Sequence, residues 1–311
     1  MKYRQINFTG LFTIIFFLFP AGCIVTARAQ PASPPPLFTS SLFTSPGSFT
    51  NDVEGPSVDK HGMVYAVNFS KKGTIGQVTA AGKAAVFITL PEGSVANGTR
   101  FDSEGNMIIA DYTKHNIFKV EMGSKALRIV AHEPRMTQPN DIAIDSKDRI
   151  YASDPDFKSN TGRFWRIDRG GKVTLLDSMG ATNGIDISPD EKTLFVNAGR
   201  AVWAYDLSPE GDVSNRRLLI EFPDFGVDGM RCDVKGNIYL ARIGKGTVVK
   251  FSSDGSIIQE IVLTGKKPTN VAFGGKDGCT MYVTLMDSGN LESFRVDEPG
   301  REWQMQQKRH R

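Results

Sequence analysis

A pattern of about 43 residues repeats along this chain of 311 residues. Each copy has a short apolar segment, a polar turn, and a second segment rich in β-branched and aromatic residues. The positions that lead the six turns are Asp59, Asp102, Asp145, Ser188, Asp233 and Gly274, separated by 43, 43, 43, 45 and 41 residues. A β-rich repeat of this length, with about four strands per copy, is typical of a propeller blade. The sequence therefore predicts an all-β fold, a six-bladed β-propeller over residues 37–297.

The last copy of the repeat has room for only three strands, near 268–273, 279–285 and 291–296. The alternating segment LFTSSLF at 37–43 can supply the fourth strand. Pairing the two ends of the chain in this way removes exposed sheet edges. We therefore predict that an N-terminal strand closes the last blade.

The repeat also aligns a set of polar residues five positions before each turn. These residues are Glu54, Asn97, Asn140, Asn183, Asp228 and Thr269. Since the first strand of each blade lines the central channel of a propeller, we expect them to form a ring at one mouth. Carboxylate and amide oxygens suit a hard divalent cation, calcium above all. Alternatively, Asn and Asp simply make turns here, because glycine follows four of the six positions.

The predicted metal ligands within this ring are Glu54, Asn140, Asn183 and Asp228. No histidine or cysteine belongs to the ring, which argues against a site selective for zinc or copper. Calcium is the expected ion, and magnesium, manganese and zinc remain alternatives.

A second register follows the predicted second strand of each blade. Its members are Asn68, Asp111, Asp154, Asn197, Arg242 and Leu285. Adjacent strands of a blade run antiparallel, so the end of the second strand lies beside the start of the first. We therefore expect these residues near the same channel mouth, where they either support the ring or contact a substrate. Solvation of strand ends is the alternative interpretation.

The ends of the chain differ in composition from the repeat region. Residues 1–29 combine a basic start, the apolar stretch LFTIIFFLF at 11–19, and a small-x-small site that ends at Ala29. This arrangement is typical of a signal peptide, and it predicts export, to the periplasm of a bacterium; an uncleaved anchor is the alternative. A proline-rich linker at 30–36 follows, and residues 298–311 are expected to form a solvated basic tail.

The net charge of the chain is +3. Three basic residues and no acidic ones lie in residues 1–29, so the repeat region is neutral overall. A neutral body lacks the clustered positive charge on which nucleic-acid binding rests. The expected partner is a small molecule, with no nucleic acid and no stable membrane span after signal cleavage. Cys232 and Cys279 are expected either to form a disulfide or to be small buried side chains.

The sequence resembles the family of gluconolactonases and senescence marker protein (regucalcin), which are six-bladed propeller lactonases. The resemblance covers residues 37–297. The matching stretches are VEGPSVD at 53–59, QPNDIAID at 138–145, IYASDP at 150–155, ATNGIDISPDEKTLFV at 181–196 and VDGMRCDVKGNIYLA at 227–241. One departure is Gln138, where some members carry an arginine that contacts a sugar-acid substrate.

The resemblance implies hydrolysis of a sugar lactone or related lactone with a divalent ion. It matches Glu54, Asn183 and Asp228 to the family's metal ligands, and Asp228 also to its general base. Asn140 matches a residue that contacts substrate or completes the metal shell. We therefore predict a lactone-hydrolysing enzyme with Asp228 as the catalytic residue. The predicted substrate-binding residues are Asn97, Asn140, Asp154 and Arg242.

Two other interpretations remain. An exported propeller without catalytic activity would bind a ligand or protein partner, since this fold serves many functions. Converging carboxylates at Glu54 and Asp228 disfavour it, because a scaffold has no need of them. The same two residues argue against an enzyme similar to strictosidine synthase, because such propellers need no central metal ligands.

Overall fold

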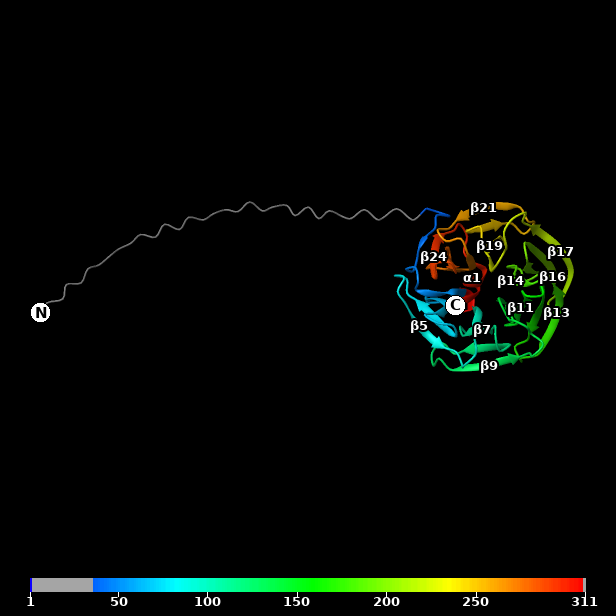
Figure 1. Cartoon of the computed structure of the whole chain (residues 1–311), viewed down its shortest axis with the longest axis horizontal. Helices are drawn as coiled ribbons and strands as arrows, with labels where there is room; N and C mark the ends of the chain where they lie inside the picture. The colour runs from blue at the N-terminus through cyan, green and yellow to red at the C-terminus, as the bar shows by residue number, and fades with distance from the viewer. Residues whose placement is uncertain (2–35, 310–311) are drawn as a thin grey trace. The chain divides into compact units, whose positions relative to one another are not determined.

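Six four-stranded sheets surround a common centre in the computed structural model, which describes Met1 and residues 36–309 (Figure 1). Within each sheet the strands follow one another antiparallel, from the centre outward. This arrangement confirms the predicted six-bladed propeller. The expected signal peptide, apart from Met1, and the expected linker up to residue 35 lie outside the described residues.

The blades follow the sequence repeat. Blade one contains β2 (Phe49–Val58), β3 (Val64–Phe69), β4 (Thr74–Val78) and β5 (Ala84–Thr89). Blade two contains β6 (Ala96–Phe101), β7 (Met107–Asp111), β8 (Asn116–Val120) and β9 (Leu127–His132). Blade three contains β10 (Ile142–Ile144), β11 (Ile150–Asp156), β12 (Thr161–Ile167) and β13 (Val173–Met179). Blade four contains β14 (Thr182–Ile187), β15 (Thr193–Ala198), β16 (Ala201–Leu207) and β17 (Val213–Glu221). Blade five contains β18 (Met230–Cys232), β19 (Ile238–Arg242), β20 (Thr247–Phe251) and β21 (Ile257–Val262). Blade six contains β22 (Pro268–Gly274), β23 (Thr280–Leu285), β24 (Asn290–Arg295) and β1 (Ser41–Leu42).

The N-terminal strand completes the sixth blade, as predicted. Ser41 of β1 pairs with Ser293 of β24, and an isolated bridge joins Leu37 to Arg295. The strand is shorter than the predicted 37–43 because Phe38 has a φ of 58°, which interrupts the extended conformation. This pairing joins the first and last parts of the propeller and removes an exposed edge.

The aspartates that lead the repeated turns have a structural role. In four blades their carboxylate oxygen accepts hydrogen bonds of 2.8–2.9 Å from the backbone amides two and four residues later. These residues are Asp59, Asp102, Asp145 and Asp233. A short acidic side chain that bonds its own turn in this way fixes the hairpin between the two inner strands. The spacing of the repeat therefore reflects the hairpin geometry.

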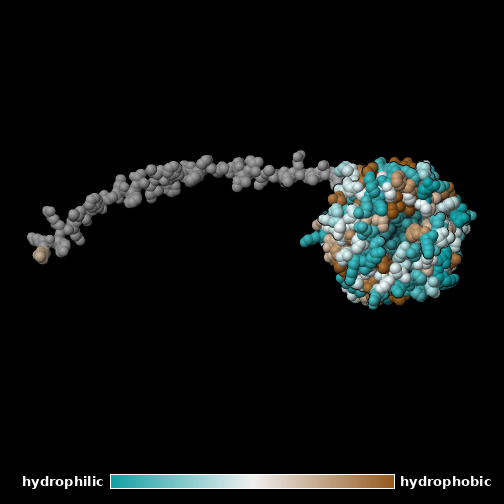
Figure 2. All heavy atoms as spheres, in the orientation of Figure 1, coloured by the Kyte–Doolittle hydropathy of each residue, from teal (hydrophilic) through white to brown (hydrophobic). Residues whose placement is uncertain are grey.

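The hydrophobic core lies between neighbouring blades. Each of six clusters joins two adjacent sheets, as where Val67 and Ile75 pack against Met107 and Phe118. Large exposed hydrophobic residues occur mainly singly on the outer strands, for example Ile129 on β9 and Leu218 on β17, and Figure 2 shows polar and apolar residues intermixed. Cys232 and Cys279 are free thiols, the first of them buried. No helix among the described residues is long and apolar enough to cross a membrane.

The C-terminal segment differs from the expected solvated tail. Helix α1 (Arg301–Arg309) lies near the centre of the ring in Figure 1, where it contacts β18 and β22. Gln306 Nε2 donates to the carbonyl of Val58, and Arg301 Nη1 donates to that of Ile144. Both acceptors end inner strands, so α1 covers the end of the channel opposite the starts of these strands. Arg301, Glu302 and Gln306 thus use their polar side chains for ion pairs and for hydrogen bonds to the backbone of inner strands.

Removing α1 is therefore expected to destabilise the whole propeller. A chain that ends at Gly300 loses the ion pair from Arg301 to Glu191 and the one from Glu302 to buried Arg100. Breaking buried ion pairs costs roughly 3–5 kcal/mol, so the free energy of unfolding should fall by at least about 3 kcal/mol. Urea unfolding measures this difference. A chain that ends at Arg309 is the control, and equal stability of the two truncated chains would contradict the structural role of α1.

Candidate active site

The six ring residues line one cavity at the start of the inner strands. Its volume is about 420 Å³. Glu54, Asn97, Asn140, Asn183, Asp228 and Thr269 all contribute to its wall. The fold thus brings together side chains from six blades, as the repeat register predicted.

The glycines that follow ring residues are explained by close packing of the inner strands. A Cβ atom on Gly229 would lie 1.9 Å from the side chain of Asn270, and one on Gly55 would lie 1.9 Å from the carbonyl oxygen of Asn97. Ring residues Glu54, Asn97 and Asn183 lie within strands rather than in turns. The alternative interpretation, in which a ring residue and the glycine after it form a turn, therefore does not apply to Glu54, Asn97 and Asn183.

Two carboxylates are buried at the bottom of the cavity. Glu54 is 9% exposed and Asp228 is 7% exposed. Glu54 Oε2 accepts hydrogen bonds from the amide of Gly55 at 2.6 Å and from Asn270 Nδ2 at 3.1 Å. Burial raises the pKa of Glu54 to about 7, and the charge of nearby Asp141 adds to the shift. Burial also raises the pKa of Asp228 well above its usual value, and repulsion from the charge of Glu54 is the second cause of this shift.

The amides of the ring complete an oxygen-rich set. Asn183 Oδ1 is buried and has no hydrogen-bond partner, which leaves an acceptor oxygen unsatisfied at the cavity wall. Asn140 Oδ1, by contrast, accepts a 2.9 Å hydrogen bond from Asn97 Nδ2. The free oxygen of Asn183 favours it over Asn140 as a ligand for a cation.

This donor set fits a hard divalent cation. Two carboxylates that repel one another in a buried site, with an unsatisfied amide oxygen nearby, are the chemistry that calcium accepts. Residues 36–309 contain no group of three or more His, Cys, Asp and Glu side chains arranged for a metal ion. A cation here would therefore depend on amide oxygens as well as on Glu54 and Asp228.

An ion-pair network closes the channel below these carboxylates. Asp141 is fully buried and lies 3.2 Å from Arg100 Nη2 and 3.1 Å from Arg231 Nη1. Both arginines are 2% exposed. Among the described residues, these side chains lie between the cavity and α1, so the cavity opens at the mouth where the inner strands start.

Two predicted substrate-binding residues do not line the cavity. Asp154 is fully buried and accepts hydrogen bonds from the amides of Thr137 and Gln138 and from Trp165 Nε1. Arg242 is 1% exposed. Its guanidinium donates to Asp224 and lies 3.8 Å from the ring centroid of Phe222. Both residues lie near the end of a second strand, next to the loops at the mouth of the cavity. Their side chains bond to these loops, Asp154 to the backbone at 137–138 and Arg242 to Asp224.

The second register supports the ring at another position. Asn197 Nδ2 donates to the carbonyl of Asp228 at 2.6 Å, and its Oδ1 accepts from the amide of Gly184 at 3.2 Å. Asn197 thereby fixes the backbone beside Asn183 and at Asp228. Asn68 also lines the cavity. Support of the ring was one of the two roles expected for this register.

Sequence reasoning missed several residues of the cavity. Asn270 does not itself line the cavity, but it donates to Glu54 and directly follows a ring position. Tyr112, Phe157 and Met286 line the entrance, and each directly follows the last residue of the second strand of its blade. The second register pointed to the correct loops, but residue type gave no sign of which side chains would face the cavity.

Comparison with known proteins assigns the chain to a family. Residues 53–287 match the SMP-30/gluconolactonase/LRE-like region. The chain belongs to this family. A pentonolactonase of Haloferax volcanii is 31% identical over 201 residues, which cover 62% of this chain and 68% of that protein. A 6-deoxy-6-sulfogluconolactonase of Pseudomonas putida is 28% identical over 238 residues, covering 68% and 80%.

The fold has close counterparts among solved structures. A calcium-binding protein, regucalcin, from Agrobacterium tumefaciens superposes with a TM-score of 0.72. The superposition covers 83% of this chain and 94% of the Agrobacterium chain, and the two sequences are 22% identical. This likeness concerns the fold. Together with the family match, it agrees with the resemblance found in the sequence.

Replacing one of the two buried carboxylates should stabilise the protein in chelator. Asp228→Asn keeps the shape and removes the repulsion with Glu54, so above pH 7 the free energy of unfolding should rise by about 1–3 kcal/mol. Added calcium should then raise the melting temperature of the unsubstituted protein and leave that of Asp228→Asn unchanged. Differential scanning calorimetry with and without calcium measures both effects.

Asp111→Asn is the matched control for this experiment. Asp111 is also fully buried, but its carboxylate accepts hydrogen bonds from Ser94 Oγ, Val95 N and Asn116 Nδ2. The same chemical change should therefore destabilise the protein there. If both variants lose stability to the same extent, repulsion between Glu54 and Asp228 does not destabilise the protein.

Proposed function

We propose that this chain is a hydrolase that opens a lactone ring with the help of a divalent cation. The observation that carries the proposal is the buried pair Glu54 and Asp228 beside the unsatisfied oxygen of Asn183, in a cavity open at one mouth. Family membership supports it, as do relatives named for pentonolactone and sulfogluconolactone hydrolysis. The name of the Agrobacterium protein, a calcium-binding protein, favours calcium.

Glu54, Asn183 and Asp228 would hold the cation, and Asn140 is available as a further oxygen. A divalent ion bound there would polarise the lactone carbonyl and stabilise negative charge on its oxygen. Magnesium, manganese and zinc are the other ions to be compared with calcium.

Asp228 is proposed to act as the general base. Its carboxylate takes a proton from water while the water oxygen bonds to the carbonyl carbon. The ring C–O bond then breaks, and Asp228 returns the proton to the departing alkoxide, which gives a hydroxy acid. Burial and Glu54 raise the pKa of Asp228, which strengthens it as a base, whereas a cation nearby would lower that pKa again.

The ring amides are proposed to orient the substrate. Asn97 Nδ2 donates to Asn140 Oδ1, which fixes the orientation of the Asn140 amide. The Asn140 nitrogen is then left to donate to an oxygen of the lactone. A fixed donor of this kind costs little reorganisation when charge develops on the substrate.

Lactone hydrolysis by the purified protein tests the proposal. Activity should disappear after chelation and return with calcium, and Asp228→Ala should lower kcat by at least about a thousandfold while the circular dichroism spectrum is unchanged. A pH indicator follows acid release from a panel that runs from gluconolactone to aliphatic lactones. Asp254→Ala, which changes an exposed aspartate in the turn between β20 and β21 and outside the cavity, is the matched control.

The alternative is a propeller that binds without catalysing. Tight calcium binding with no hydrolysis of any lactone in the panel would favour that interpretation and reject the proposed activity. An active Asp228→Ala protein would reject the role of Asp228 alone.

We further propose that the chain is exported. The basic start, apolar stretch and small-x-small site within residues 1–29 support this. Expression of the full chain in a bacterium should release a periplasmic protein whose N-terminus, read by mass spectrometry, is Gln30. Retention of residues 1–29 in the membrane fraction would show an uncleaved anchor instead.

A further inference from the structure

The entrance of the cavity carries apolar side chains beside polar ones such as Asp52 and Lys72, whereas the ring residues of its floor are all polar. Four lining residues above the ring have large apolar surfaces: Val95, Tyr112, Phe157 and Met286. They lie before β6 or directly after β7, β11 and β23, on three blades. We call these four side chains the apolar rim. A polar floor under an apolar rim is the usual composition of a site that binds a ligand with both kinds of surface.

Phe157 is the most exposed member of the apolar rim. This residue is 50% exposed. Its loop is fixed, because the Asp156 carboxylate accepts hydrogen bonds from the amides of Lys158 at 3.0 Å and Ser159 at 3.2 Å. An aromatic ring held at the edge of a cavity offers apolar area that a ligand can cover.

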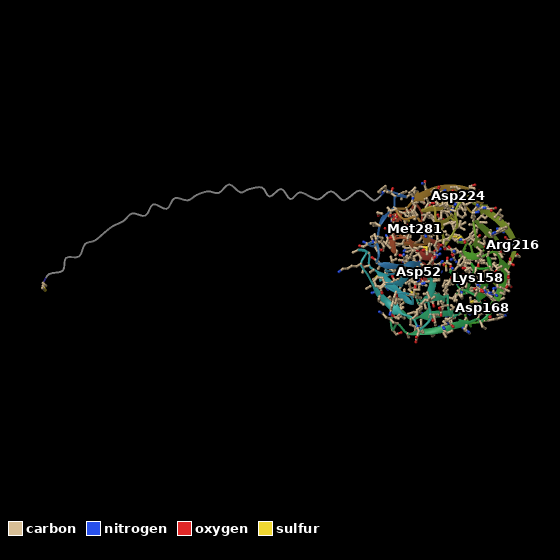
Figure 3. All side chains as sticks on the ribbon, viewed as in Figure 1. Asp52, Lys158, Asp168, Arg216, Asp224 and Met281 are labelled. Carbon is tan, nitrogen blue, oxygen red and sulfur yellow. The ribbon has the colours of Figure 1, made fainter. Side chains whose placement is uncertain are left out.

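The charges of the cavity leave no cation for an anionic ligand. Among the described residues that line it, Lys72 is the one cation, and its Nζ lies 3.1 Å from the Asp52 carboxylate. Lys158 is exposed and does not line the cavity. In Figure 3, Asp52 lies nearer the middle of the ring than Arg216 of the outermost strand β17. With a divalent cation between Glu54 and Asp228, the cavity would be neutral.

We propose that the substrate is an uncharged lactone that carries an apolar alkyl or aryl substituent. Its ring carbonyl reaches the floor, and its substituent packs against the apolar rim. Lactones that carry a carboxylate, sulfonate or phosphate are disfavoured, because the lining cation, Lys72, is already paired with Asp52 and two buried carboxylates lie on the floor. This proposal rests on the lactonase function proposed above.

A homologous series tests the substrate class. The calcium-loaded protein is assayed on γ-lactones whose alkyl chain grows from none to hexyl, on gluconolactone, and on a lactone with a free carboxylate. Burial of each methylene on the rim should raise kcat/KM by about threefold to fourfold. The carboxylated lactone should be at least about tenfold poorer than an uncharged lactone of similar size.

Two rim variants localise the effect. Phe157→Ala and Met286→Ala should each lower the ratio of kcat/KM for the hexyl lactone to that for the unsubstituted one, by about threefold or more. Phe225→Ala is the matched control, because Phe225 is 51% exposed, lies on a loop and does not line the cavity. It should keep the unsubstituted protein's ratio.

The outcomes separate this proposal from the lactonase function. A flat alkyl series, or a preference for the carboxylated lactone that Lys72→Met abolishes, overturns the apolar substituent while hydrolysis itself stands. If no lactone is hydrolysed, calorimetric binding of 2-hexylcyclopentanone and of cyclopentanone still tests the rim. Tighter binding of the hexyl ketone, lost in Phe157→Ala, supports the proposal, and equal binding overturns it.

Discussion

The ion pairs of Asp141 with Arg100 and Arg231 are the interaction on which the centre of this molecule depends. All three side chains are almost fully buried. Six inner strands surround one axis, and this network joins the second, third and fifth of them. Because unpaired charges are very costly in such a place, the network and the helix that covers it must form together. Helix α1 contributes Glu302 beside Arg100 and thereby belongs to the core of the propeller.

The same network shapes the cavity above it. Asp141 raises the pKa of both Glu54 and Asp228, whereas Arg231 lowers that of Glu54. Two carboxylates are thus held in a low-dielectric site where each disfavours the charge of the other. Such an arrangement reduces stability in the absence of a ligand and is common where a protein trades stability for function. A cation bound between them would remove that cost.

The proposed chemistry and the proposed selectivity belong to different parts of the fold. The ring residues lie at the starts of the inner strands, where neighbouring backbones approach so closely that Gly55 and Gly229 leave no room for a Cβ atom. The apolar rim lies on loops, which can change without disturbing the sheets. Relatives with other substrates can therefore share the floor of this cavity and differ at residues such as Phe157.

The sequence by itself determined the number of blades, the closure of the last blade and the ring of polar residues. Each follows from a local pattern, because the turn-leading aspartates set a regular hairpin and a fixed register places Glu54 and Asp228 at equivalent points. Only the tertiary structure decided the rest. Asp154 and Arg242 have the same polar character as the ring residues, yet they turn toward loops that need their hydrogen bonds. The role of α1 and the apolar rim depend on contacts between distant blades, which no local pattern encodes.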